Sequence, residues 1–364
     1  MNTNIFEKMA EHGYEQITFF YDKETGLKAI NCIHSTELGP AGGGTRMLAY
    51  ETEDAALEDA LRLSRGMTYK NACAGLNIGG GKTVVIADPK QVRRDVVTEE
   101  AFFRSLGRFI ETLGGRYIPG VDMNTTTEDM LLMYNETKHV MAIPGEAEGD
   151  GHTATAWGTY RAIEACCEIV FGSPSVAGKR VAVQGIGGCG WLVAKFLHDN
   201  GAELVVCDPN AERCDAAKKQ FGAEVVGQDE IYDVDCDIFS PNAIGAIIND
   251  ATVPRLKCRI ICGAANNILE DEDRHGTAVM QRGIVCAPDF IANAGGIIFD
   301  GLNNVYGGLW AKRVMEETDK IYGRTLEVIK QAQRENRPPI AVANEMAEKR
   351  IEAIKRIERT YTGK

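Results

Sequence analysis

The alternation of apolar and polar residues divides the chain into two differently organised halves. In the second half, short apolar runs alternate with amphipathic stretches. The runs RVAVQ, ELVVC, AEVV, CDIFS, RIICG and GIVCAP predict strands, and helices are predicted over 157–171, 189–200 and 211–221. Short apolar strands that alternate with helices predict a parallel sheet with helices on both faces.

The first half mixes strands and helices. Strands are predicted over 16–21, 27–34 and 83–88, and helices over 53–66 and 98–113. The sequence DKETG between the first two strands predicts a hairpin turn. Thr126 and Asp129 predict a capping box at the start of another helix.

With 364 residues, the chain is too long for one ordinary core, so we expect an α/β protein of two domains. The polar, Gly-rich stretch 145–156 is a candidate hinge. We place the domains at 1–148 and 149–334, followed by a C-terminal helix within 335–364. The apolar stripe of this helix requires a partner surface, either on the first domain or on another subunit.

Composition excludes several classes of protein. The net charge of −12 argues against a general nucleic-acid binder, and no apolar stretch reaches the ~20 residues of a membrane span. The N-terminus lacks the features of a signal peptide. The eleven cysteines, an odd number without a CxxC pair, indicate reduced thiols in the cytoplasm and no metal site.

The strongest motif follows the strand RVAVQ. Gly185, Gly187 and Gly190 form G-x-G-x-x-G, with Gly188 inside it, between a predicted strand and a predicted helix. Asp208 ends the next strand, where a carboxylate can accept hydrogen bonds from ribose hydroxyls and repel a 2′-phosphate. The pattern predicts a Rossmann-type domain that binds NAD. The alternative is a Gly-rich loop that binds another ligand.

Two lysines lie in unusual apolar, Gly-rich surroundings. GLNIGGGKT resembles a phosphate-binding P-loop, but Leu76 stands where the first glycine belongs and a strand follows, so we reject that interpretation. Oxidation of an amine needs a cation for the substrate carboxylate, a base and a proton carrier. Lys70, Lys82 and Asp122 can fill these roles, with a lowered lysine pKa. Surface lysines and a capping aspartate explain the spacing equally well.

At these residues the sequence resembles the Glu/Leu/Phe/Val dehydrogenase family, in particular its leucine, phenylalanine and valine branch. The resemblance covers nearly the whole chain, in motifs that occur in the family's order. They are LGPAGGGTRM, RGMTYKNACAGLNIGGGKTVV, GGRYIPGVDMNT, VAVQGIGGCG, CDIFSP, GAANNIL and APDFIANAGG.

The resemblance implies roles for individual residues. Lys70 would bind the substrate carboxylate, Lys82 would activate water, and Asp122 would be its acid/base partner. Others would lie in the cleft near substrate and nicotinamide, namely Gly43, Gly44, Asn266, Asn293 and Thr155. The family's order implies a catalytic and oligomerisation domain first, an NAD-binding domain second, and final helices that return to the first. It also implies a homo-oligomer, from dimer to octamer.

The chain departs from the branch at several positions. Gly-His152-Thr-Ala-Thr155 replaces a stretch that contacts the cofactor, and Asn242 replaces a common cysteine. In the side-chain pocket, the departures are Gly42, Gly120 and Asp300, beside the apolar lining residue Ile297. We expect the two glycines to enlarge the pocket. Asp300 either recognises a polar or cationic substrate side chain or turns out to solvent.

The sequence thus predicts NAD-dependent, reversible deamination of a branched-chain or aromatic L-amino acid. One alternative is the same chemistry on a larger or polar amino acid, such as tryptophan, tyrosine or a basic residue, recognised by Asp300. The other is a non-catalytic sensor that binds NAD.

Overall fold

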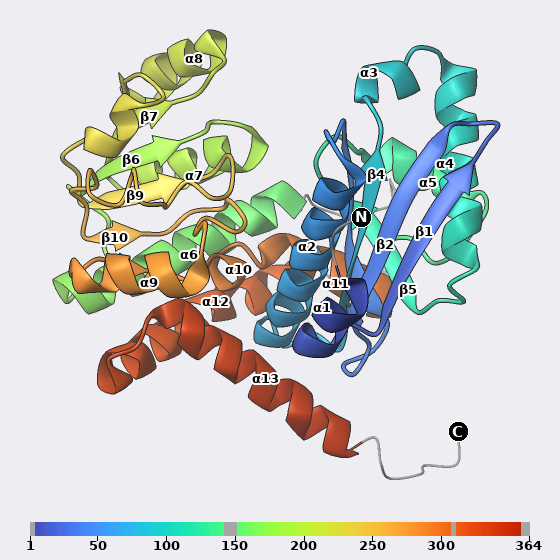
Figure 1. The fold of residues 1–364 in the computed structure, drawn as a ribbon. Helices are drawn as coiled ribbons and strands as arrows, with labels where there is room; N and C mark the ends of the chain where they lie inside the picture. Colours follow the sequence, from blue (N-terminus) through green and yellow to red (C-terminus); the bar gives the residue numbers. More distant parts are fainter. Residues whose placement is uncertain (1–3, 142–150, 307–310, 358–364) are drawn as a thin grey trace. The chain divides into compact units, whose positions relative to one another are not determined.

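The computed structural model describes residues 4–141, 151–306 and 311–357 (Figure 1). The chain forms two compact units. Unit 1 holds the described residues of Met1–Glu148, Asp300–Leu309 and Ala347–Lys364, and unit 2 holds those of Gly149–Phe299 and Trp310–Met346. The predicted boundary after residue 148 lies outside the described residues.

Two segments belong to a different unit from the one that the sequence predicts. The segment that begins at Asp300 groups with unit 1, because Gly301 packs against the side chains of Leu76 and Ile78. Residues 335–346 group with unit 2, where Ile340 packs against Gly276.

Unit 1 is built on a mixed five-stranded sheet in the order β1-β2-β4-β3-β5. Its elements, in chain order, are α1 (Ile5–His12), β1 (Gln16–Asp22), β2 (Leu27–Ser35), β3 (Ala41–Leu48), α2 (Glu53–Cys73), β4 (Gly79–Ile86), α3 (Pro89–Val92), α4 (Val96–Glu111), β5 (Tyr117–Val121) and α5 (Thr127–Tyr134). Strands β1 and β2 form the predicted hairpin, and β2 pairs with β4 antiparallel, whereas β3 runs parallel to β4 and β5.

Both faces of this sheet are covered. One core cluster joins β2 to α4 and α5 through Phe103, Leu106 and Met130, and the other joins β2 to α2 through Leu57 and Leu61. The predicted capping box is confirmed, since the Thr126 hydroxyl and the Asp129 carboxylate each accept a backbone N–H of the other residue.

The sequence prediction missed β3 because of its glycines. Three consecutive glycines weaken an isolated strand, since they have no side chains to pack. Here the neighbouring backbone requires them. A Cβ atom on Gly43 would lie 1.8 Å from the carbonyl oxygen of Gly81 on β4. Close packing of β3 on β4 therefore decides the structure of this segment.

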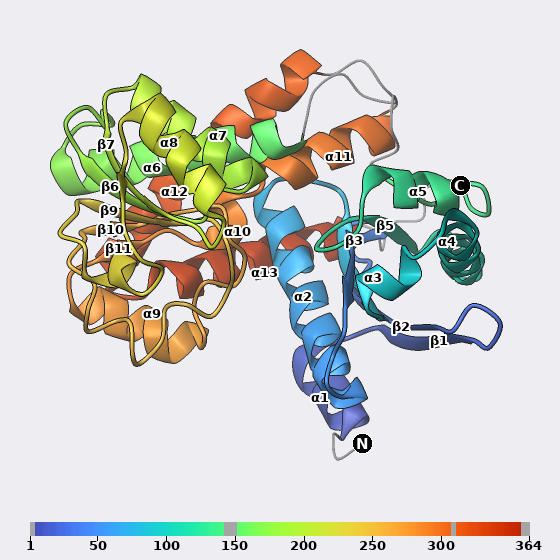
Figure 2. The same ribbon diagram turned by 90° about the horizontal axis from the view of Figure 1, so that it is seen from above.

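Unit 2 contains a six-stranded sheet, β11-β10-β9-β6-β7-β8, in which all pairs are parallel, as predicted. Its elements are α6 (Gly151–Phe171), β6 (Arg180–Gln184), α7 (Gly188–Asp199), β7 (Glu203–Cys207), α8 (Ala211–Phe221), β8 (Glu224–Val225), the 3₁₀ helix η1 (Glu230–Asp233), β9 (Ile238–Pro241), β10 (Ile260–Ile261), α9 (Glu272–Gln281), β11 (Val285–Cys286), α10 (Asp289–Ala292) and α12 (Ala311–Glu335). Two further helices, α11 (Gly295–Tyr306) and α13 (Pro339–Ile357), begin in unit 2 and end in unit 1. Figure 2 shows α6 alongside α12 and α9 next to β11.

The candidate hinge is partly helical. Residues 151–156 form the first turns of α6, where the Thr155 hydroxyl donates to the carbonyl of Gly151 at 2.8 Å. The rest of the stretch, 145–150, lies outside the described residues. Over the described part of the chain, no helix is long and apolar enough to span a membrane.

Candidate active site

Lys82 lies in the middle of β4 and is buried, with 4% of its surface exposed. Its Nζ lies 2.8 Å from Oδ2 of Asp122, the first residue after β5. Two residues that are 40 positions apart in sequence therefore meet, because β3 pairs with both β4 and β5.

Burial and charge shift the pKa of both groups. Burial lowers the pKa of Lys82 below its usual value, although the Asp122 carboxylate counteracts part of the shift. Burial alone would raise the pKa of Asp122, but Lys82 and Arg46 outweigh it and hold this pKa well below its usual range. Near neutral pH the site thus combines an ionised carboxylate with a lysine that releases its proton more readily than an ordinary one.

Arg46 on β3 completes this cluster. Its Nε donates to Oδ2 of Asp122 at 2.8 Å, and its Nη1 lies 3.1 Å from the carboxylate of Asp59 on α2. The structure thus places Arg46 in ion pairs with both Asp122 and Asp59. The alternation of β3 was the available signal, because Gly44 and Arg46 share one face of a strand.

The glycines of β3 make room for the pair. A Cβ atom on Gly44 would lie 2.7 Å from the Cβ of Asp122 and 3.2 Å from Nζ of Lys82. The hydroxyl of Tyr117 donates to the carbonyl of Gly43 at 2.9 Å and fixes the strand there. Gly44 thus lets the backbone run directly beside the two charged side chains, while Gly43 lets β3 lie close to β4.

Gly42 and Gly120 do not enlarge the pocket as expected. A Cβ atom on Gly42 would lie 2.7 Å from Cγ2 of Ile78 and 3.2 Å from Cε of Met141, and one on Gly120 would lie 2.9 Å from Cγ of Met141. The side chains of Ile78 and Met141 therefore fill the space beside the two glycines. The sequence reasoning missed both residues, because it considered the glycines without their neighbours in space.

Lys70 and Asp300 lie in the same unit and interact electrostatically. Lys70 is in the last turn of α2, and Asp300 is in α11. Burial raises the pKa of Asp300 to about 7, and the positive charge of Lys70 limits the shift. A carboxyl group that changes its charge near neutral pH is typical of functional sites.

In unit 2, the glycine fingerprint lies between β6 and α7, as the sequence predicts. Gly185 has a φ of 87°, which favours glycine, and its N–H donates to the carbonyl of Cys207. A Cβ atom on Gly190 would lie 2.1 Å from the carbonyl oxygen of Gly185. Gly187 is the N-cap of α7 and Gly188 its first residue, so the positive end of the helix dipole faces this turn.

Asp208 follows β7 and is held beside the same turn. Its carboxylate accepts the backbone N–H groups of Ile186 and Asn210 at 2.8 and 2.9 Å. Each carboxylate oxygen keeps a further lone pair, so both can still accept a ribose hydroxyl. Arg213 on α8 lies 4.0 Å from Asp208.

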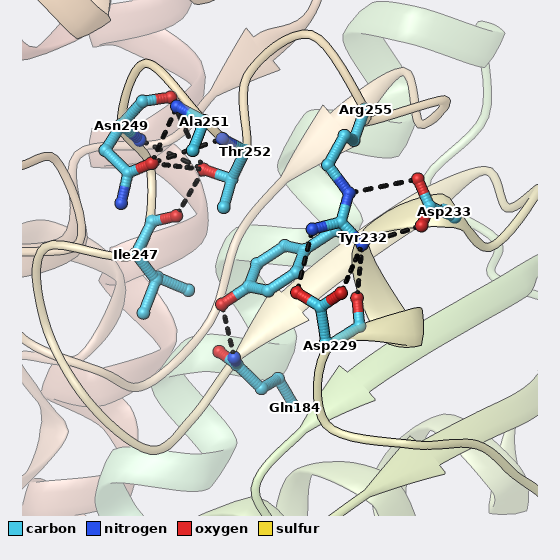
Figure 3. Close-up of polar contacts among 9 residues, drawn as sticks. All are labelled: Gln184, Asp229, Tyr232, Asp233, Ile247, Asn249, Ala251, Thr252 and Arg255. Atoms are coloured by element: carbon cyan, nitrogen blue, oxygen red, sulfur yellow. Dashed lines mark hydrogen bonds and ion pairs between the residues drawn. The ribbon is translucent and has the colours of Figure 1, made fainter.

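Side chains beyond the fingerprint brace it. Figure 3 shows the Gln184 amide directed at the hydroxyl of Tyr232, 2.9 Å away, while Arg255 binds the carboxylates of Asp229 and Asp233. The hydrogen bond attaches η1 to the last residue of β6, and the ion pairs attach Arg255 to η1 and the residue before it. The segment 151–155, which departs from the family's usual sequence, also reaches the glycine turn between β6 and α7. The ring of His152 would lie 3.5 Å from a Cβ atom on Gly188.

The remaining predicted site residues of unit 2 form a second group. Nδ2 of Asn293 donates to Oδ1 of Asn266 at 2.9 Å, and Thr155 lies against Gly296. Oδ1 of Asn293 is buried and has no hydrogen-bond partner among the described residues, which indicates a missing donor. Ile297 is buried in α11. This orphaned acceptor and the glycine cradle fit a dinucleotide. The described residues contain no cluster of His, Cys, Asp or Glu suited to a metal ion.

Comparison with known proteins agrees with this arrangement. Two family profiles match, the dimerisation domain of Glu/Leu/Phe/Val dehydrogenases over residues 14–139 and the Glutamate/Leucine/Phenylalanine/Valine dehydrogenase domain over 208–358. Leucine dehydrogenase of Thermoactinomyces intermedius is 48% identical over 98% of this chain and 96% of its own length.

Solved structures show the same similarity. The crystal structure of L-tryptophan dehydrogenase from Nostoc punctiforme matches with a TM-score of 0.80 at 39% identity, over 96% of this chain and 99% of the other. The hetero-hexameric glutamate dehydrogenase from Thermus thermophilus shares the fold, with a TM-score of 0.78 at 20% identity over 96% and 91% of the two chains. The chain belongs to the Glu/Leu/Phe/Val dehydrogenase family, a family of amino-acid dehydrogenases.

Proposed function

We propose that the chain catalyses the reversible, NAD-dependent oxidative deamination of an L-amino acid. An L-amino acid, NAD⁺ and water give a 2-oxo acid, ammonium, NADH and a proton. The observation that supports this most directly is the buried Lys82, with its lowered pKa, 2.8 Å from the Asp122 carboxylate. A protein that only binds NAD has no need of such a pair.

Each residue has a defined task in this proposal. Gly185, Gly187, Gly188 and Gly190 would hold NAD⁺, with Asp208 on its ribose, and the bound cofactor would supply the hydride acceptor for the oxidation. Lys70 would pair with the substrate carboxylate. Neutral Lys82 would take a proton from water as its oxygen attacks the imine carbon. Asn266, Asn293 and Thr155 would orient the substrate and the amide group of the nicotinamide.

Asp122 is suited to exchange protons with the substrate nitrogen. Arg46 and Lys82 both make their closest contacts with Oδ2. One oxygen thus fixes the carboxylate, while the other would serve the substrate.

The relatives guide the choice of substrate. They are named for leucine, tryptophan and phenylalanine, so we propose a branched-chain or aromatic amino acid, in a cytoplasmic homo-oligomer. The eleven cysteines are all thiols outside any disulfide, which is typical of a reducing compartment. The test is NADH formation with a panel of L-amino acids at alkaline pH. Absence of turnover with every one of them, and with every 2-oxo acid plus ammonium and NADH, would refute the proposal.

Asp300 favours a second candidate, an amino acid whose side chain ends in a cation or a hydrogen-bond donor. Its carboxyl group interacts with Lys70 on the same unit, and the adjacent Gly301 packs on Ile78, which also contacts Gly42. Asp300 would thus stand near the side-chain pocket. The matched substrates are L-ornithine and L-norleucine, whose side chains have equal length but differ in the terminal ammonium. If Asp300→Val leaves their ratio of kcat/KM unchanged, the candidate fails.

A further inference from the structure

The Lys82–Asp122 pair belongs to a longer chain of charged contacts within unit 1. From the pair, the contacts run to Arg46 on β3 and then to Asp59 on α2. The hydroxyl of Tyr50 donates to Oδ2 of Asp59 and closes the chain. Charges alternate along it, from lysine to carboxylate to guanidinium to carboxylate.

Arg46 is placed to act on Lys82 without touching substrate. Its Nε and the Nζ of Lys82 each lie 2.8 Å from the same oxygen of Asp122, so the two cations stand no farther apart than twice that distance. Two positive charges this close in a buried site repel each other appreciably. The neutral form of Lys82 is thereby favoured, while the shared carboxylate keeps its position.

Asp59 has the opposite effect. It holds Arg46 through contacts of 3.1 and 3.4 Å from Nη1 to its two oxygens, and it partly neutralises the guanidinium. Accordingly, Arg46 lowers and Asp59 raises the pKa of Lys82, both less than burial and Asp122 do.

The other titratable groups around Lys82 stay neutral. Cys32 pairs with it across β2, and burial raises the pKa of this thiol to about 12. On the same strand, burial lowers the pKa of His34 to about 4. On β5, burial raises the pKa of Tyr117 above its usual value. The charges that shift the pKa of Lys82 are those of Asp122, Arg46 and Asp59.

We propose that Arg46, clamped by Asp59, is a positioning residue that fixes the Asp122 carboxylate and supplies a positive charge that helps Lys82 lose its proton. This inference rests on the proposed function, because it concerns the pKa of the base in that reaction. Arg46 and Asp59 lie on β3 and α2, outside the predicted substrate and cofactor contacts.

The test uses two variants of opposite charge and the pH dependence of kcat/KM for oxidative deamination. We expect Arg46→Met to move the rising limb of this profile to higher pH by about 1 unit, the order of magnitude for one nearby charge. Asp59→Asn should move the same limb to lower pH, because Arg46 then acts uncompensated. Arg46→Lys should restore most of the original limb, since it keeps the charge.

Tyr50→Phe is the matched control, because it removes a hydrogen bond from Asp59 without changing a charge, and its limb should stay in place. Residues that only support the fold would lower the rate without opposite shifts, so an unchanged limb in Arg46→Met and Asp59→Asn overturns the inference. Where Arg46→Met fails to fold, Asp59→Asn and Arg46→Lys decide. A wild-type enzyme without any turnover would instead refute the proposed function.

Discussion

The backbone at Gly44 passes so close to Asp122 that a Cβ atom at position 44 would stand 2.7 Å from the Cβ of that residue. The same atom would lie 2.6 Å from the carbonyl oxygen of Val121. Real Cβ atoms do not tolerate such distances, so any larger residue must displace the aspartate or the backbone beside it. The geometry of the acid/base pair thus depends on the absence of a side chain on the neighbouring strand.

Gly44→Ala should therefore impair catalysis more than folding. We expect kcat/KM to fall by about 100-fold, because a displacement of ~1 Å at a reacting group has effects of that size. The control is Gly323→Ala on α12, where a Cβ would meet nothing within 4 Å. Equal activity of Gly44→Ala and wild type would contradict the close approach.

Lys82→Met should strongly reduce turnover while leaving NADH binding intact. Loss of a general base costs typically 10²–10⁴-fold in rate. In the wild type, kcat/KM for oxidative deamination should rise with pH through the pKa of Lys82, which lies below that of an ordinary lysine. Steady-state rates from pH 6 to 11 would locate this limb, with the exposed Lys28→Met as control. A limb at the ordinary lysine pKa would contradict the assignment.

Asp208→Asn should reduce the preference for NAD over NADP. The amide keeps an acceptor for a backbone N–H but loses the charge that repels a 2′-phosphate, and Arg213 stands 4.0 Å away to receive it. We expect the ratio of kcat/KM for the two cofactors to shift by at least about tenfold, or ~1.4 kcal/mol. The exposed Asp215→Asn, also near α8's start, should leave the ratio unchanged.

The charge of Asp300 gives the substrate preference a pH dependence. Because the pKa of this carboxyl is raised to about 7, it is mostly neutral below that pH and negative above it. The kcat/KM ratio of L-ornithine to L-norleucine should therefore increase as the pH rises through 7. In Asp300→Asn this increase should be absent, and a wild-type ratio that stays flat from pH 6 to 8 would count against a role in specificity.

Asp129→Ala should destabilise unit 1. Asp129 is buried, completes the capping box of α5 and accepts hydrogen bonds from Nη1 and Nη2 of Arg93. We expect the free energy of unfolding in urea to fall by about 2–3 kcal/mol. This is less than the ~3–5 kcal/mol lost when one partner of a fully buried ion pair is removed, because Arg93 is partly exposed. The neighbouring exposed Glu128→Ala should change it by less than about 0.5 kcal/mol.

Much of unit 2 followed from local signals. Six apolar runs predicted six strands, and the spacing of Gly185, Gly187 and Gly190 predicted the turn between β6 and α7. These features can be predicted from the sequence because strand hydrophobicity and turn conformation are properties of short segments. The same reasoning failed at β3, whose glycines have a low strand preference and are required only by the approach of β4.

The sequence by itself determined the two-domain α/β plan, the glycine turn and the residue types needed for amine oxidation, because these follow from chain length and from short local motifs. Only the tertiary structure decided that Arg46 and Lys82 contact the same carboxylate oxygen of Asp122. It also decided that Met141 occupies the space left at Gly42 and Gly120. Those relationships join residues far apart in the chain. They depend on strand order and on packing in three dimensions, which no local pattern specifies.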